Sequence, residues 1–85
     1  MCGFILYIPT SKKNIFNKKK FIQSSKLIDH RGPDSKNNHF SEFVKMIFFR
    51  LSIVDTSKLG NQPMLSYSKR FIIVFNGEIY NAKDL

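Results

Sequence analysis

Apolar positions along the chain fall into short runs and one periodic stretch, and this pattern predicts three strands and one helix. The run at residues 4–8 is followed by Pro9, which suits a short buried strand. Residues 14–29 place apolar and small side chains at helical spacing, with Asn14 as the expected N-cap. We begin this helix ahead of the lysine triplet 18–20, because cations at a helix N-terminus oppose the helix dipole.

The longest apolar segment, residues 43–55, is predicted to be a strand because β-branched and aromatic residues dominate it. Side chains alternate between the two faces of a strand. One predicted face carries Ile47, Phe49, Leu51 and Ile53, and the other carries Met46, Phe48, Arg50, Ser52 and Val54. Both faces are therefore largely apolar, and Arg50 lies inside a segment expected to be buried.

Turn residues and polar stretches separate these elements. Residues 30–35 end the helix, because Pro33 disfavours helical geometry at the preceding Gly32. Residues 36–41 and 56–62 are polar and are expected to form loops.

A third strand is predicted at residues 71–75. It leads into Asn76-Gly77, a strong signal for a hairpin turn because both residue types tolerate positive φ. Asn81 is a suitable cap for a helix that begins at Ala82.

Composition restricts the chain to one small globular domain. It has 85 residues, of which 42% are hydrophobic and 24% are charged. Its net charge of +8 is compatible with a nucleic-acid or anionic membrane partner. However, most of the excess is lysine in clusters at residues 12–13 and 18–20, and no zinc-finger, basic-zipper or RNA-binding motif is present. We expect neither a nucleic-acid nor a membrane partner, and a basic nucleic-acid-binding module remains a remote alternative.

Cysteine content and hydropathy point to a cytoplasmic protein. Cys2 is the only cysteine, so an intramolecular disulfide is excluded and a reducing compartment is favoured. The apolar runs at residues 4–8 and 43–54 are too short for a signal peptide or a membrane span.

Cys2 is the first candidate for chemistry. A free cysteine is usually a small buried apolar residue. Removal of Met1, however, would leave Cys2 with a thiol and an α-amine on one carbon. In model peptides, α-amines have a reference pKa of about 8 and thiols one of about 8.5, so an α-amine is suited to act as a general base for a thiol on the same carbon.

Arg50 is the second candidate, because a desolvated guanidinium requires an anion or other acceptors. Its planar fork of donors matches a carboxylate in two-point contact. The carboxylate could belong to a bound substrate, to Asp34 or to Asp55. The pattern alone favours the internal salt bridge.

Asn76 and Gly77 form the third candidate. On spacing alone, they are more simply explained as a plain hairpin turn. The functional alternative is an oxyanion hole, in which the Asn76 side-chain amide and the Gly77 backbone N–H stabilise a developing negative charge.

Five motifs that occur in a fixed order connect these candidates. They are Met1-Cys2-Gly3-Phe4, His30-Arg31-Gly32-Pro33-Asp34, Arg50-Leu51-Ser52-Ile53-Val54-Asp55, Asn61-Gln62-Pro63-Met64 and Phe75-Asn76-Gly77-Glu78-Ile79-Tyr80-Asn81. This series resembles the glutaminase domain of glutamine-dependent asparagine synthases, which are class II amidotransferases with an N-terminal nucleophile.

The resemblance implies a role for each site residue. Cys2 corresponds to the nucleophile that attacks the side-chain amide of L-glutamine, and its α-amine corresponds to the general base. Arg50 corresponds to the residue that binds the substrate α-carboxylate. Asn76 and Gly77 correspond to the oxyanion hole, and Glu78 corresponds to a residue that helps bind the substrate amine.

The resemblance also implies a larger protein. The implied fold is of the α+β class, a four-layer α/β/β/α sandwich of the Ntn-hydrolase type with antiparallel sheets and flanking helices. Residues 1–85 would be its N-terminal part, so the sandwich would be incomplete in this chain. An ammonia-accepting synthetase domain, absent here, would bind ATP and Mg²⁺ and amidate aspartate. No metal or cofactor is expected in this chain, and a homo-oligomer is compatible with the full-length enzyme. The 85-residue chain alone is expected to be inactive.

Two alternatives lie within the same family. One is a non-catalytic truncated relic that keeps the motifs. The other is an amidotransferase that acts on a surface-sugar precursor instead of aspartate.

Overall fold

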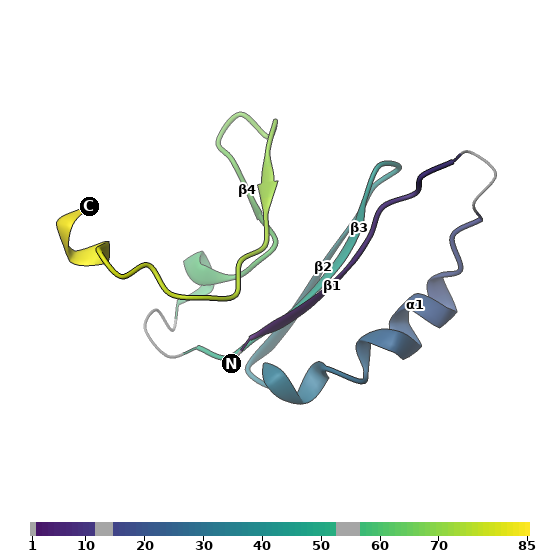
Figure 1. Ribbon diagram of the computed structural model, residues 1–85, viewed down its shortest axis with the longest axis horizontal. Coiled ribbons are helices and arrows are strands. Elements are labelled where there is room, and N and C mark those ends of the chain that lie inside the picture. The colour runs from purple at the N-terminus through teal and green to yellow at the C-terminus, as the bar shows by residue number, and fades with distance from the viewer. Residues whose placement is uncertain (1, 12–14, 53–56) are drawn as a thin grey trace.

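The computed structural model describes residues 2–11, 15–52 and 57–85. Its main sheet is antiparallel, with strand order β1-β3-β2. The helix α1 runs along one side of this sheet, and a small two-stranded hairpin lies on the other side (Figure 1). The strands are β1 (Gly3–Tyr7), β2 (Ser35–Phe40), β3 (Lys45–Arg50), β4 (Met64–Leu65) and β5 (Ile72–Ile73). The helices are α1 (Lys18–Ser25) and the 3₁₀ turns η1 (Asp29–Arg31), η2 (Lys58–Gly60) and η3 (Ala82–Asp84).

The central strand β3 confirms the predicted alternation of faces over residues 45–50. Ile47 and Phe49 point towards α1, where they form the core with Phe21. Met46 and Phe48 lie on the opposite face and are also buried, and the ring of Phe48 stacks on that of Phe4. The strand ends at Arg50, and the predicted positions Ile53, Val54 and Asp55 lie outside the described residues.

The strand predicted at residues 4–8 is present as β1, and it pairs with β3. The register pairs Gly3 with Phe49 and Tyr7 with Lys45, so the first residues of the chain lie beside the last residues of β3. On the other side of β3, Ser35 pairs with Arg50. The beginnings of β1 and β2 therefore meet at the carboxyl end of β3.

The predicted start of the helix was wrong. α1 begins at Lys18, and its N-cap is Asn17, whose side chain accepts a hydrogen bond from the Lys20 N–H. The proposed cap Asn14 lies outside the described residues. The lysine triplet therefore occupies the first turn despite the dipole, because Asn17 satisfies a terminal donor and the Lys18 ammonium lies 5.4 Å from the centroid of the Phe40 ring.

The predicted loop at residues 36–41 is mostly strand. β2 has a polar sequence, but its backbone pairs with β3 along the whole strand from Ser35 to Phe40. Phe40 packs on the helix side of the sheet, and the Lys36 ammonium lies 5.9 Å from the centroid of the Phe49 ring. Pairing with β3 thus places these residues in a strand although their own strand propensity is weak.

The hairpin prediction at Asn76-Gly77 was also wrong. The chain turns earlier, between β4 and β5, where the Ser66 N–H donates to the Phe71 carbonyl and Lys69 takes a positive φ of 61°. Gly77 has no positive φ. The strand predicted at residues 71–75 is reduced to Ile72–Ile73.

The end of the chain forms one 3₁₀ turn, Ala82–Asp84, in place of the predicted helix start. The Asn81 side chain does not cap it. No helix in the described segments is long and apolar enough to cross a membrane. The architecture is that of an α+β chain with small antiparallel sheets and a single α-helix in its described part.

Gly32 lies where two backbone segments make their closest approach. A Cβ atom on Gly32 would lie 2.2 Å from the Phe49 carbonyl carbon and 2.4 Å from the Arg50 nitrogen. The neighbouring Pro33 forms a bridge with Arg50. A side chain at position 32 would therefore push η1 away from β3.

We expect Gly32→Ala to destabilise the fold by about 3 kcal/mol, because the neighbouring backbone cannot move aside as a side chain can. The measurement is the thermal unfolding midpoint of the complete gene product. Gly77→Ala is the matched control, because its Cβ would meet only ring atoms of the exposed Phe75, the nearest at 3.0 Å. Equal midpoints for the two variants would contradict the close approach.

Candidate functional site

The Cys2 thiol is held against the backbone of Leu51. Its sulfur accepts a hydrogen bond from the Leu51 N–H at 3.3 Å and lies 3.6 Å from the Leu51 carbonyl, to which the S–H donates. The residue is half-buried. Since Leu51 directly follows Arg50, the structure brings two of the predicted site residues to the same end of β3.

Arg31 fixes the backbone beside the thiol. Its Nε donates to the Cys2 carbonyl at 3.1 Å. A Cβ on Gly3 would lie 3.1 Å from the Arg31 Cδ, so this side chain packs directly over the glycine. Arg31 belongs to the motif at residues 30–34. Its contact with Cys2 could not be predicted from local sequence, because the two residues are 29 positions apart.

Arg50 is 6% exposed, although it carries a full charge. Its Nη1 donates to the Ser57 carbonyl and, at 2.7 Å, to the Asn61 Oδ1. Asp34, one of its predicted partners, instead accepts a hydrogen bond from the Ser52 N–H at 2.6 Å. The other predicted partner, Asp55, lies outside the described residues. Neutral oxygens of the segment 57–61 thus surround part of the buried guanidinium.

Asn76 comes close to the start of β1. It lines a small cavity of about 190 Å³ together with Gly3, Phe4, Ile28 and Arg31. Gly77 and Glu78 follow on an exposed stretch outside the strands. The structure therefore brings Cys2, Arg50 and Asn76 to one end of the sheet, whereas Glu78 lies on the surface.

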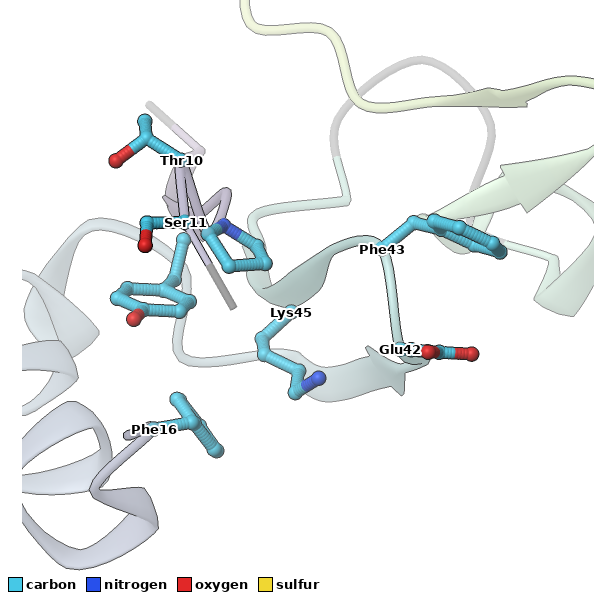
Figure 2. A pocket seen from close by; sticks show the side chains of 8 residues that line it. Thr10, Ser11, Phe16, Glu42, Phe43 and Lys45 are labelled. Atoms are coloured by element: carbon cyan, nitrogen blue, oxygen red, sulfur yellow. The ribbon is translucent and has the colours of Figure 1, made fainter. Parts of the chain in front are cut away.

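A larger pocket of about 450 Å³ lies at the other end of β1 (Figure 2). Tyr7, Phe16, Glu42 and Lys45 are among its lining residues. The Lys45 amine already has two partners within the protein: it donates a hydrogen bond to the Ser41 carbonyl, and it lies 5.2 Å from the centroid of the Phe16 ring. None of the predicted site residues lines this pocket.

No metal centre is evident in the part of the chain that the structure describes. There, no three His, Cys, Asp or Glu side chains come together as the ligands of an ion would.

Comparison with known proteins identifies one family. Residues 1–85 match the model of a glutamine amidotransferase domain. An asparagine synthetase [glutamine-hydrolyzing] from Zea mays is 32% identical over 85 residues, and asparagine synthetase [glutamine-hydrolyzing] 1 from Bacillus subtilis is 37% identical over 95. Each alignment covers 100% of this chain but 14% of the relative. No solved structure gives a significant match.

The contact between Arg31 and Cys2 leads to a prediction about thiol accessibility. Arg31→Met removes the hydrogen bond to the Cys2 carbonyl, so the start of β1 should open more often. We expect alkylation of Cys2 by iodoacetamide to become about tenfold faster. The rate is followed by mass spectrometry of the peptide that contains Cys2.

Arg70→Met is the matched control, because Arg70 is exposed and its guanidinium lies over the ring of Phe71, away from Cys2. Equal alkylation rates in the two variants would show that Arg31 does not restrain the thiol.

Proposed function

The chain belongs to the glutamine amidotransferase domain family, and from this premise we propose that it is the N-terminal part of a domain that hydrolyses glutamine. The ammonia released would be used by a synthetase domain to amidate aspartate. The observation that supports this most directly is the Cys2 thiol at the end of β3, against Leu51 and next to the buried Arg50.

In the proposed reaction, Cys2 becomes the first residue after Met1 is removed. Its α-amine accepts the thiol proton, and the sulfur attacks the side-chain carbonyl carbon of glutamine. The resulting oxyanion is stabilised by the Asn76 side-chain amide and the Gly77 N–H. The C–N bond then breaks, the proton passes to the leaving nitrogen, and ammonia departs.

The second half of the reaction regenerates the thiol. Water attacks the carbonyl carbon of the glutamyl thioester, and the α-amine accepts a proton from that water. The C–S bond breaks, the sulfur takes the proton back from the amine, and glutamate is released. No metal or cofactor takes part in either half.

Substrate recognition is assigned to Arg50 and Glu78. The guanidinium would bind the α-carboxylate of glutamine, because its planar donors match the two oxygens. Its burial strengthens such a contact, since little water competes for the charge. The Glu78 carboxylate would attract the substrate ammonium.

The rest of the domain is part of the same proposal. β3 carries buried side chains on both faces, as expected for a sheet between two layers. We therefore propose the α/β/β/α sandwich of Ntn hydrolases for the complete domain. ATP and Mg²⁺ would bind in the synthetase domain, and residues 1–85 alone would lack activity.

The test of this function is glutamate release by the complete gene product and two variants. Cys2→Ala should abolish glutamine hydrolysis. Arg50→Lys should mainly raise the KM for glutamine, by roughly 30-fold, because losing a two-point contact costs about 2 kcal/mol. Amide formation from added ammonia should be retained in both variants.

Two results would contradict the proposal. Glutamine hydrolysis by Cys2→Ala at the wild-type rate would exclude the thiol as nucleophile. An equal loss of ammonia-dependent synthesis in Arg50→Lys would show that Arg50 only supports the fold.

A separate prediction concerns the N-terminus. We expect Met1 to be removed in cells, because the proposed mechanism needs a free amine on the residue that carries the thiol. Intact-mass analysis of protein purified from its own organism measures this. Full retention of Met1 would exclude the α-amine as the base for this thiol.

A further inference from the structure

Two adjacent side chains, Asn61 and Gln62, contact different halves of the candidate site. Asn61 accepts a hydrogen bond from Arg50, and Gln62 makes two hydrogen bonds to Phe75, the residue before Asn76. Building on the proposed function, we propose that Asn61 and Gln62 are positioning residues. They fix the spacing between the group that binds the substrate carboxylate and the groups that stabilise the oxyanion.

Gln62 holds Phe75 in the way a neighbouring strand would. Its Oε1 accepts from the Phe75 N–H at 2.5 Å, and its Nε2 donates to the Phe75 carbonyl at 3.3 Å. One side-chain amide thus satisfies both backbone groups of one residue, as the two bonds of an antiparallel pair do.

This contact is needed because the β4–β5 ladder ends before the oxyanion donors. β5 stops at Ile73, and residues 75–78 are exposed. Two hydrogen bonds on Phe75 fix the peptide plane that leads into Asn76. An oxyanion hole requires donors that are in place before the reaction, so this restraint acts where stabilisation depends on it.

Asn61 acts on the other half of the site. Its Oδ1 accepts from the Arg50 Nη1 at 2.7 Å and from the Ser35 hydroxyl at 3.3 Å. Ser35 pairs with Arg50 in the register of β2 and β3, so Asn61 is tied to two strands at once. The guanidinium is therefore oriented by a side chain that is itself anchored to the sheet.

Because Asn61 and Gln62 share a peptide bond, they link the position of Arg50 to the position of Phe75. A bound glutamine must reach from the guanidinium to the oxyanion donors, and the dipeptide sets that span. The two residues should nevertheless have separable kinetic effects. Gln62 acts on groups used in the transition state, whereas Asn61 acts on a group that binds the substrate before and during the reaction.

The experiment compares Gln62→Met and Asn61→Leu in the complete gene product. We expect Gln62→Met to lower kcat for glutamine hydrolysis about 100-fold while KM changes less than about threefold. Asn61→Leu should raise KM about tenfold with a smaller effect on kcat. Ammonia-dependent synthesis should be retained in both.

Two further variants distinguish positioning from stability. Gln23→Met is the matched control for Gln62→Met, because Gln23 is exposed on α1 and the substitution is the same. Gln62→Glu keeps the acceptor for the Phe75 N–H but loses the donor, so it should recover part of the lost kcat. Equal falls in kcat for Gln62→Met and Gln62→Glu, or a parallel loss of ammonia-dependent synthesis, would overturn the proposal.

Amide hydrogen exchange tests the same contact without relying on activity. Gln62→Met should make exchange at the Phe75 amide about fivefold faster than in the wild type, with no change in Gln23→Met. Unchanged exchange at Phe75 would overturn the positioning role. If the wild type fails to hydrolyse glutamine while exchange responds as expected, the proposed function fails and the structural link between Gln62 and Phe75 stands.

Discussion

The burial of the Arg50 guanidinium at the end of β3 constrains much of the surrounding structure. A charge removed from water must be surrounded by hydrogen-bond acceptors, and the buried residues that precede Arg50 in β3, from Met46 to Phe49, supply only apolar side chains. The chain meets this requirement by folding residues 57–61 back over β3, where the Ser57 carbonyl and the Asn61 side chain accept from Nη1. This return places Gln62 where it can reach Phe75. The next residue, Asn76, lines a small cavity together with Gly3 and Phe4 of β1.

The five motifs that carry the family resemblance are largely the segments that meet at this end of the sheet. Cys2 contacts Leu51, Arg31 contacts Cys2, and Asn61 contacts Arg50. In the sequence, α1 and most of β2 lie between these motifs. α1 packs on the sheet face that carries Ile47 and Phe49, and β2 runs from this end of the sheet towards the other. The motif residues thus belong to one connected set of contacts, and the segments between the motifs belong to the supporting layer.

Sequence patterning predicted the two apolar faces of β3, because a continuous apolar run of this length has few other solutions. The strand at residues 4–8 was also predicted, but it is not buried as expected, because the Phe4 and Leu6 side chains of β1 are exposed. β2 was missed because its stability comes from pairing with β3 and not from its own polar residues. The turn prediction at Asn76-Gly77 was wrong because it rested on local turn preference alone. It took no account of the Gln62 side chain, which accepts a hydrogen bond from Phe75, 13 positions further along the chain. The contacts of Arg50 with the Ser57 carbonyl and the Asn61 side chain were likewise not predictable, because neutral backbone and amide oxygens leave no charge pattern in the sequence. The predicted partner Asp55 lies outside the described residues.

The pairing of Cys2 with Leu51 joins residues 49 positions apart, and this separation determines an order of events during synthesis. The N-terminal residues are made first, but β1 has no partner until β3 has been translated and has emerged. During that interval the N-terminus is unpaired and accessible to enzymes that act on nascent chains. Under the proposed mechanism, removal of Met1 would be easiest before the sheet closes, so the pace of translation, as well as the final fold, would bear on how the α-amine of Cys2 is freed.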